Sequence, residues 1–118
     1  MARDHRKLDA FNLAVEFAIK IYKATGKSPV EERYGLQSQI RRASVSSPTN
    51  IVEGCARDSE TEYLRFLEIA FSSCREGLYL TDLSMRLDCL TALAARELEQ
   101  LGGRTAAAIS ALRHSIRG

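Results

Sequence analysis

Apolar and small residues recur at spacings of three and four along most of this 118-residue chain. Side chains at that spacing share one face of an α-helix. The composition agrees, because Ala, Leu, Glu and Arg are plentiful, aromatic residues make up only 7% and Trp is absent. A chain of this length buries about two-thirds of the surface that it exposes when unfolded. The sequence therefore predicts one all-α domain, residues 1–118.

The spacing divides the chain into four expected helices. The first runs from about residue 8 or 9 to Thr25, and the second covers residues 36–57. The third follows a cap at Ser59 and runs to about Leu87, and the fourth follows a cap at Thr91. Short connections favour an antiparallel, up-down-up-down four-helix bundle. In each of the last three helices, the apolar and small residues that should face the core form a line, here called the seam. The three expected seams are Leu36, Ile40, Ala43, Ser47, Ile51 and Gly54; Tyr63, Leu67, Ala70, Cys74 and Gly77; and Ala94, Leu98, Leu101, Thr105, Ala108 and Leu112.

Two local patterns bear on where helices begin and break. Ser28-Pro29-Val30-Glu31 is a capping box and predicts a short helical turn, which Gly35 interrupts. Gly102 and Gly103 cost the fourth helix roughly 1 kcal/mol each relative to Ala, so they mark either a break or a place of close helix contact. Because the apolar spacing resumes at Thr105, one continuous helix is expected.

The first expected helix is apolar around most of its circumference, since only Asn12, Glu16, Lys20 and Lys23 form a narrow polar stripe. A surface helix normally carries a single apolar stripe. Burial on two sides is therefore expected, and in so small a domain the second side is more simply a subunit interface than internal core. The two apolar series are Leu8, Phe11, Val15, Ala18 and Tyr22, and Ala10, Ala14, Phe17, Ile21 and Ala24.

Pro48 lies in the middle of the second expected helix. It removes the amide that would bond the Ser44 carbonyl and clashes with it, at a cost of roughly 3 kcal/mol. The chain must kink here or restart with Ser47 as a cap and Pro48 at the first helical position. Because the seam keeps its phase across the proline, one kinked helix is favoured.

A second stripe on this helix is polar and nearly balanced in charge. It passes through Arg42, Ser46, Asn50, Glu53 and Arg57. The simplest interpretation is a solvated face. However, small residues crowd this helix and permit close approach of a neighbour, and charged groups buried there need partners. A buried or interfacial polar network is therefore favoured, with a solvated face as the alternative.

Few residues suggest chemistry. His5 and His114 lie near opposite ends of the chain, and neither has Cys, Asp or Glu at the spacing of a metal site. Cys55, Cys74 and Cys89 match neither a disulfide framework nor a zinc site, so reduced thiols are expected. No general base accompanies a candidate nucleophile. The sequence predicts a non-enzymatic protein without a cofactor, and an enzyme with an unrecognised site stays the minority alternative.

The cysteines and the apolar runs add two expectations. Cys74 lies on a seam and is expected in the core, whereas Cys55, beside Arg57 at a helix end, is expected to be the more reactive thiol. No apolar run is long enough for a membrane span, and none follows Met1. A cytoplasmic protein without a membrane partner is therefore expected.

Both ends of the chain are basic, although the net charge is only +2. Such segments could bind phosphates, and the absence of interleaved aromatic residues predicts binding that tolerates any sequence and weakens with salt. The alternative is a purely structural assembly without affinity for RNA or DNA. The candidate phosphate-binding residues of the two ends are Arg3, Arg6, Lys7, Arg104, Arg113 and Arg117.

The run from Tyr34 to Ala70 carries the motif GLxxQIRRAxxSxPxNIxEGxxRxSxxExxRFLxIA. This motif resembles the small bacterial four-helix-bundle proteins encoded in intervening sequences of large-subunit rRNA genes. That family includes the accessory variability determinant of diversity-generating retroelements. The resemblance extends upstream through Leu13, Ala14, Ile21, Tyr22, Pro29 and Glu32.

The resemblance implies a homo-oligomer, expected as a homopentameric ring of bundles. For the retroelement relative it also implies a basic surface that engages nucleic acid and a reverse transcriptase. Five residues match motif positions: Arg41, Arg42, Asn50, Glu53 and Arg57. A structural role is expected for Asn50 and Glu53. For the three arginines, binding of a partner and stabilisation of the bundle both stay open.

Overall fold

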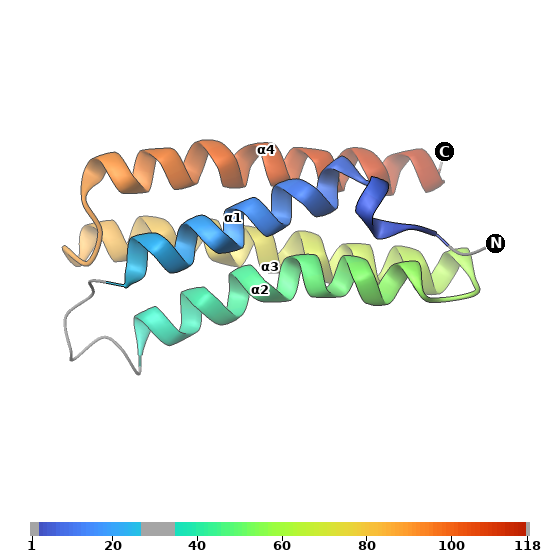
Figure 1. Cartoon of the computed structure of the whole chain (residues 1–118), viewed down its shortest axis with the longest axis horizontal. Helices are drawn as coiled ribbons and strands as arrows, with labels where there is room; N and C mark the ends of the chain where they lie inside the picture. Colours follow the sequence, from blue (N-terminus) through green and yellow to red (C-terminus); the bar gives the residue numbers. More distant parts are fainter. Residues whose placement is uncertain (1–2, 27–34, 118) are drawn as a thin grey trace.

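The computed structural model describes residues 3–26 and 35–117 and confirms the predicted all-α, up-down-up-down four-helix bundle (Figure 1). No strand occurs in these two ranges. The elements are the short 3₁₀-helix η1, His5–Lys7, and the α-helices α1, Asp9–Thr25, α2, Leu36–Cys55, α3, Glu60–Arg86, and α4, Ala92–Arg117.

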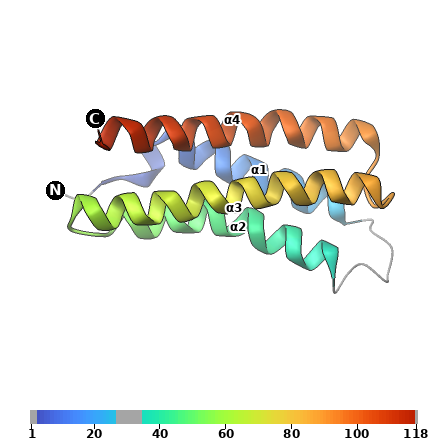
Figure 2. The ribbon, with the colours of Figure 1, turned by 180° about the vertical axis from the view of Figure 1, so that it is seen from behind.

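The four α-helices alternate in direction, so the first and last described residues lie at the same end of the bundle (Figures 1 and 2). Each helix packs against two neighbours, in the cyclic order α1, α2, α3, α4. The molecule measures 46 × 23 × 19 Å. A cross-section of that size accommodates two layers of two helices, each about 10–12 Å wide.

Two of the predicted helix caps are confirmed. The Ser59 side chain accepts a hydrogen bond from the Glu62 amide at 3.1 Å, and the Thr91 hydroxyl accepts one from the Ala94 amide at 3.1 Å. Each hydroxyl satisfies an amide that has no partner inside the first helical turn. The capping box at Ser28–Glu31 lies outside the described residues.

Helix α2 passes through Pro48 without a restart. Ser47 is not a cap, because its side chain is fully buried and donates a hydrogen bond to the Ala70 carbonyl of α3 at 2.9 Å. The predicted seam is confirmed, with Ile40 and Ile51 fully buried on either side of the proline. Packing against α3 therefore offsets the hydrogen bond that Pro48 removes.

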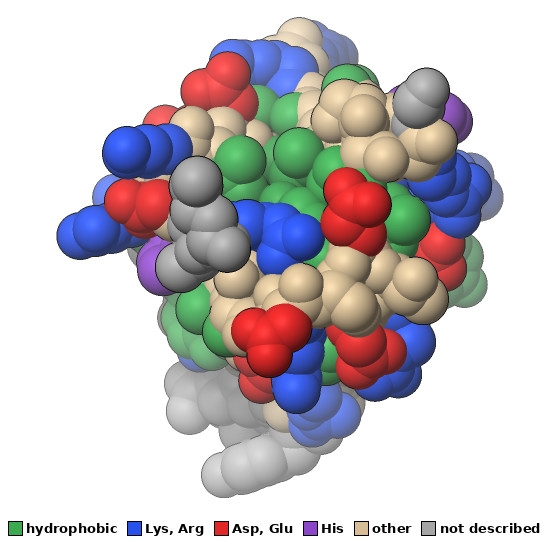
Figure 3. All heavy atoms as spheres, turned by 90° about the vertical axis from the view of Figure 1, so that its right-hand side faces the viewer, with side chains coloured by type: hydrophobic (Ala, Val, Ile, Leu, Met, Phe, Trp, Pro, Cys, Tyr) green, Lys and Arg blue, Asp and Glu red, His purple; other side chains and the backbone are tan. Residues whose placement is uncertain are grey.

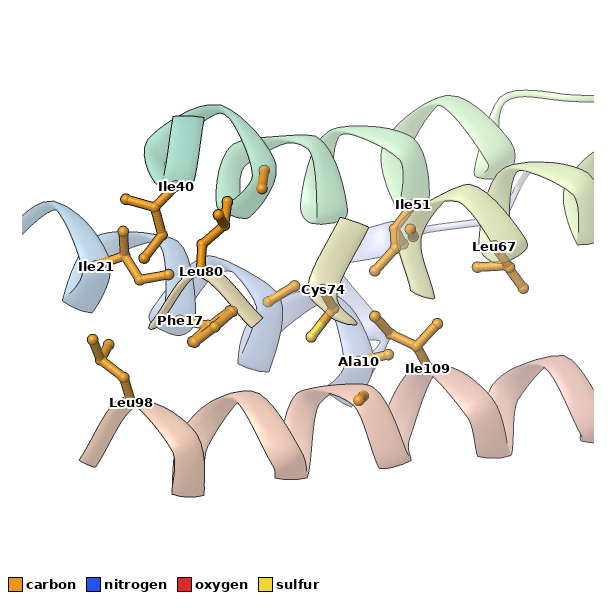
Figure 4. Packing of buried hydrophobic residues seen from close by; sticks show 14 of the residues in the cluster. Ala10, Phe17, Ile21, Ile40, Ile51, Leu67, Cys74, Leu80, Leu98 and Ile109 are labelled. Atoms are coloured by element: carbon orange, nitrogen blue, oxygen red, sulfur yellow. The ribbon is translucent and has the colours of Figure 1, made fainter. Parts of the chain in front are cut away.

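The centre of the core is the ring of Phe17, which α1 inserts toward α3 and α4 (Figure 4). A Cβ atom on Gly77 of α3 would lie 3.1 Å from the Phe17 ring. A Cβ atom on Gly102 of α4 would lie 2.9 Å from the ring and 2.5 Å from a methyl group of Leu78. The two glycines thus leave the space that the ring fills, and Gly102 marks close contact rather than a break.

The predicted seam of α4 is partly wrong, because the helix is rotated about its axis relative to the prediction. Leu98 and Thr105 are fully buried as expected, but Ala94, Leu101 and Ala108 are only half-buried. The helix turns Gly102 toward Phe17, which moves these residues to its flank. Small residues therefore mark the line of closest approach better than the larger apolar residues do. The buried line is Ala95, Leu98, Gly102, Thr105, Ala106 and Ile109.

The adjacent glycines of α4 allow a matched test of this packing. We expect Gly102→Ala to lower the free energy of unfolding by about 1–3 kcal/mol, because the added methyl group would lie too close to the Phe17 ring and to Leu78. Gly103→Ala is the control, since nothing lies within 4 Å of its Cβ position. It should raise the free energy of unfolding by about 1 kcal/mol through helix propensity. Urea unfolding of both variants measures the difference. Equal changes in the free energy of unfolding would contradict the close contact between Gly102 and Phe17.

Candidate interaction surfaces

The polar stripe of α2 forms a hydrogen-bonded seam with α3 over part of its length. The Asn50 side-chain amide donates to the Ser46 carbonyl at 2.8 Å and to the Ser46 hydroxyl at 3.0 Å. The Ser46 hydroxyl in turn lies 2.9 Å from the Ser73 hydroxyl of α3. Asn50 and Ser46 are half-buried. This seam satisfies the short polar side chains where the two helices approach each other.

The larger network expected from Arg42, Asn50, Glu53 and Arg57 does not close within one protomer. In the part of the chain that the structure describes, no hydrogen bond or ion pair joins these four side chains to one another. Arg42 lies eight residues before Asn50, about 12 Å along a helix, which is too far for direct contact. Arg57 stacks on the ring of Phe66 at 4.7 Å. Arg42, Glu53 and Arg57 are exposed.

Arg41 joins α2 to the end of α1. Its Nε donates to the Thr25 hydroxyl at 2.9 Å, and its Nη2 donates to the Tyr22 carbonyl at 3.1 Å. Its guanidinium also lies 4.4 Å from the centre of the Tyr22 ring. The contacts satisfy a carbonyl group in the last turn of α1, where a positive charge is favourable. Within one protomer Arg41 therefore stabilises the bundle.

The candidate phosphate-binding residues of the chain ends occupy two places. Arg3, Arg6 and Lys7 lie around η1, and Arg113 and Arg117 lie in the last turns of α4, at the same end of the bundle (Figure 3). Arg57 follows α2 at this end as well. Arg104 is separate, because it lies in the middle of α4 and lines an open groove between α1 and α4.

Three of these basic side chains have hydrogen-bond or ion-pair partners within the described residues. Arg6 pairs with Asp4 at 3.0 Å and lowers the pKa of that carboxyl, and Arg117 pairs with Glu68 of α3. Arg3 donates to the Arg57 carbonyl at 2.9 Å and stacks on the ring of Tyr63 at 4.1 Å.

The same end of the bundle carries acidic residues from the connection between α2 and α3. Asp58, Glu60 and Glu62 all belong to this connection or to the first turn of α3. Figure 3 shows acidic and basic side chains interspersed, with hydrophobic side chains between them. The end is therefore a surface of mixed charge in one protomer, although both terminal segments are basic.

The expected reactivity of Cys55 is wrong. Its side chain is only 3% exposed, and burial raises the pKa of the thiol. Beside it, burial raises the pKa of Tyr63 to about 12. Cys74 is fully buried in the core as predicted, and burial raises the pKa of its thiol to about 11. The three cysteines form no disulfide, and Cys89 is half-buried near the start of α4.

The burial of the cysteines predicts the order in which they react with a thiol reagent. A thiol reagent at neutral pH should modify Cys89 rapidly, whereas Cys55 and Cys74 should react only when the protein unfolds, because the reactive species is the thiolate. Cys89→Ser should abolish the rapid phase of a colorimetric thiol titration, and Cys55→Ser should leave it intact. Loss of the rapid phase in Cys55→Ser would contradict this order.

Helix α1 buries most of its second apolar series in the chain's own core and the first series in part: Ala18 is buried, and Leu8 and Phe11 pack against the core. Ala10, Ala14, Phe17 and Ile21 of the second series are buried. Of the first series, Tyr22 is 44% exposed, and Ile19, which belongs to neither series, is 50% exposed. Of the remaining large exposed apolar side chains, Val45 lies on α2, and the others are distributed over α3, α4 and their connection: Ile69, Tyr79, Leu87 and Leu93.

In residues 3–26 and 35–117 no group of three or more His, Cys, Asp or Glu side chains is close enough to hold a metal ion. None of the described helices has an apolar stretch that could cross a membrane.

Comparison with known proteins agrees with this architecture. The sequence profile of the family described as 23S rRNA-intervening sequence protein matches residues 6–111. A crystal structure of a protein of unknown function from Bacteroides thetaiotaomicron, from the S23 ribosomal protein family, superposes with a TM-score of 0.82. The two chains are 20% identical, over 89% of this chain and 95% of the other, so the similarity concerns the fold. No curated protein matches the sequence.

Proposed function

The chain belongs to the 23S rRNA-intervening sequence protein family, and on that premise we propose that it is a homo-oligomeric interaction module without a catalytic role. The observation that carries the proposal is the uncovered apolar surface of α1 and α2. Ile19, Tyr22 and Val45 are 50%, 44% and 41% exposed on two neighbouring helices. Single exposed apolar residues are ordinary, but a group on adjacent helices is typical of a protein interface.

The buried side chains whose pKa values are raised support a non-catalytic role. Tyr63, Cys55 and Cys74 have raised pKa values because they are buried in helix packing. A catalytic group with a shifted pKa would instead lie in a cleft that a substrate can enter. These three side chains are explained by packing alone.

The proposed assembly is a closed ring of five copies, as the family resemblance implies. A ring forms when one surface of a protomer meets a different surface of the next and the rotation closes. Light scattering at micromolar concentration should therefore give about five times the 13.1 kDa mass of one chain. A mass of one chain at that concentration would rule out the assembly, and a smaller or larger multiple would correct only the ring size.

A second candidate function is sequence-tolerant binding of RNA or DNA, with a reverse transcriptase as a further partner in a retroelement. The gathering of Arg3, Arg6, Lys7, Arg113 and Arg117 at one end of the bundle favours it. In a ring of cyclic symmetry every copy presents this end on the same side. Five copies of a weakly basic end then act together on one polyanion.

Charge reversal at an exposed lysine tests nucleic-acid binding. Lys7→Glu should reduce retention of RNA in filter binding at low salt, and moderate salt should weaken the wild type steeply because bound counterions are released. Arg96→Glu is the control, since Arg96 is exposed near the start of α4, at the opposite end of the bundle. Absence of retention at both salt concentrations would eliminate this function, and equal effects of the two variants would relocate the site.

A further inference from the structure

We propose that the corner between α2 and α3 is a binding site for the guanidinium group of an arginine side chain. Arg3 fills this site as a latch, and an arginine of another protein takes its place. The site, called the corner site, consists of the backbone carbonyl of Arg57 and the ring of Tyr63. The proposed self-association plays no part in this contact, which lies within a single protomer.

The carbonyl of the corner site lies just beyond the end of α2. Helix α2 ends at Cys55, and the Nη1 of Arg3 donates to the Arg57 carbonyl at 2.9 Å. The carboxyl end of a helix carries a partial negative charge. A cation at this position is therefore stabilised, although the group that it contacts is a neutral carbonyl.

The ring of the corner site is fixed by the packing of α2 against α3. Tyr63 of α3 is only 3% exposed. Its ring packs on Gly54 of α2, where an added Cβ atom would lie 3.1 Å from the Cδ1 atom of the ring. The guanidinium of Arg3 lies 4.1 Å from the ring centre. The core therefore holds in place an aromatic face that attracts a cation.

The two contacts together select a guanidinium group over an ammonium group. A guanidinium is planar, so it can stack on a ring and donate a hydrogen bond from its edge at the same time. An ammonium group is a compact, strongly hydrated charge without a face that stacks. In the described residues Arg3 forms no ion pair, so the carbonyl and the ring are the groups that hold its charge.

Arg3 is the polar link between the N-terminal segment, residues 3–8, and the corner site. The segment is otherwise held by local contacts. The Asp4 side chain accepts a hydrogen bond from the Arg6 amide at 3.0 Å, and Asn12 of α1 donates to the Arg6 carbonyl at 3.2 Å. Among the described residues, the segment makes one hydrogen bond to α2, α3 or their connection, and Arg3 makes it. Exchange of this one side chain would therefore open the corner site.

The charges beside the corner site favour a basic segment of another protein. Asp58 in the connection and Glu60 at the start of α3 are exposed, and neither forms an ion pair with a described residue. Two free carboxylates beside a guanidinium site complement a protein segment that carries an arginine and a further base. Phosphates of a nucleic acid cannot occupy the corner site, because its carbonyl accepts hydrogen bonds and does not donate them.

Arg3→Ala empties the corner site and allows binding of a free arginine derivative to be measured. Titration with N-acetyl-arginine amide should give a saturable shift of the Tyr63 ring resonance in NMR spectra, which Tyr63→Phe assigns. N-acetyl-lysine amide at the same concentration is the control for charge, and it should bind at least tenfold more weakly. The wild type should also bind the arginine derivative at least tenfold more weakly than Arg3→Ala, because the tethered Arg3 competes at a high effective concentration.

Two further variants separate the latch from a general effect of charge. Lys7→Ala is the matched control, because Lys7 is an exposed base of the same segment without an ion pair among the described residues, and it should behave as the wild type. Arg3→Lys retains the charge in case Arg3→Ala disturbs the corner, and it should also bind more tightly than the wild type. Absence of a saturable shift in both Arg3 variants would overturn the site. Equal binding of the two derivatives would overturn its selectivity, and equal binding by the wild type would overturn the latch.

Discussion

One aromatic ring sets the orientation of three of the four helices. Phe17 of α1 fills the space that Gly77 of α3 and Gly102 of α4 leave open, so the rotation of each helix about its axis is fixed by the same contact. Successive side chains of a helix are about 100° apart, so Ile19 points almost directly away from Phe17. The contact that closes the core therefore also determines which apolar side of α1 faces outward.

Helices α2 and α3 pack by a different means. Ser47 donates to the Ala70 carbonyl, the Ser46 and Ser73 hydroxyls hydrogen-bond across the two helices, and Asn50 donates to Ser46 within α2. Each of these polar groups is satisfied, so the close approach carries no cost of unpaired buried groups. Small polar residues therefore let α2 approach α3 closely, while Ile40 and Ile51 of the same helix are fully buried in the core.

Local signals in the sequence were enough for the helices, whereas long-range contacts decided the rest. The hydroxyls of Ser59 and Thr91 cap helices wherever the bundle places them, so these starts could be predicted. The phase of α4 could not, because it depends on Phe17, 85 residues before Gly102. Cys55 was misjudged for the same reason, since its burial and its contact with Tyr63 exist only in the folded chain. The apolar excess of α1 could be predicted because it follows from the residue spacing of one helix, and in the described residues Ile19 and Tyr22 remain exposed.

The helix topology places the basic termini next to acidic residues. An even number of antiparallel helices returns both ends of the chain to one end of the bundle, and it returns the acidic connection between α2 and α3 to that end as well. In a single protomer, acidic and basic groups contribute opposite signs to the electrostatic potential at this end. At physiological ionic strength this potential is screened within about 8 Å. Affinity for a polyanion would then depend on how many copies present this end together. In this protein the proposed self-association would have to come first, and any binding of nucleic acid would be a property of the assembly.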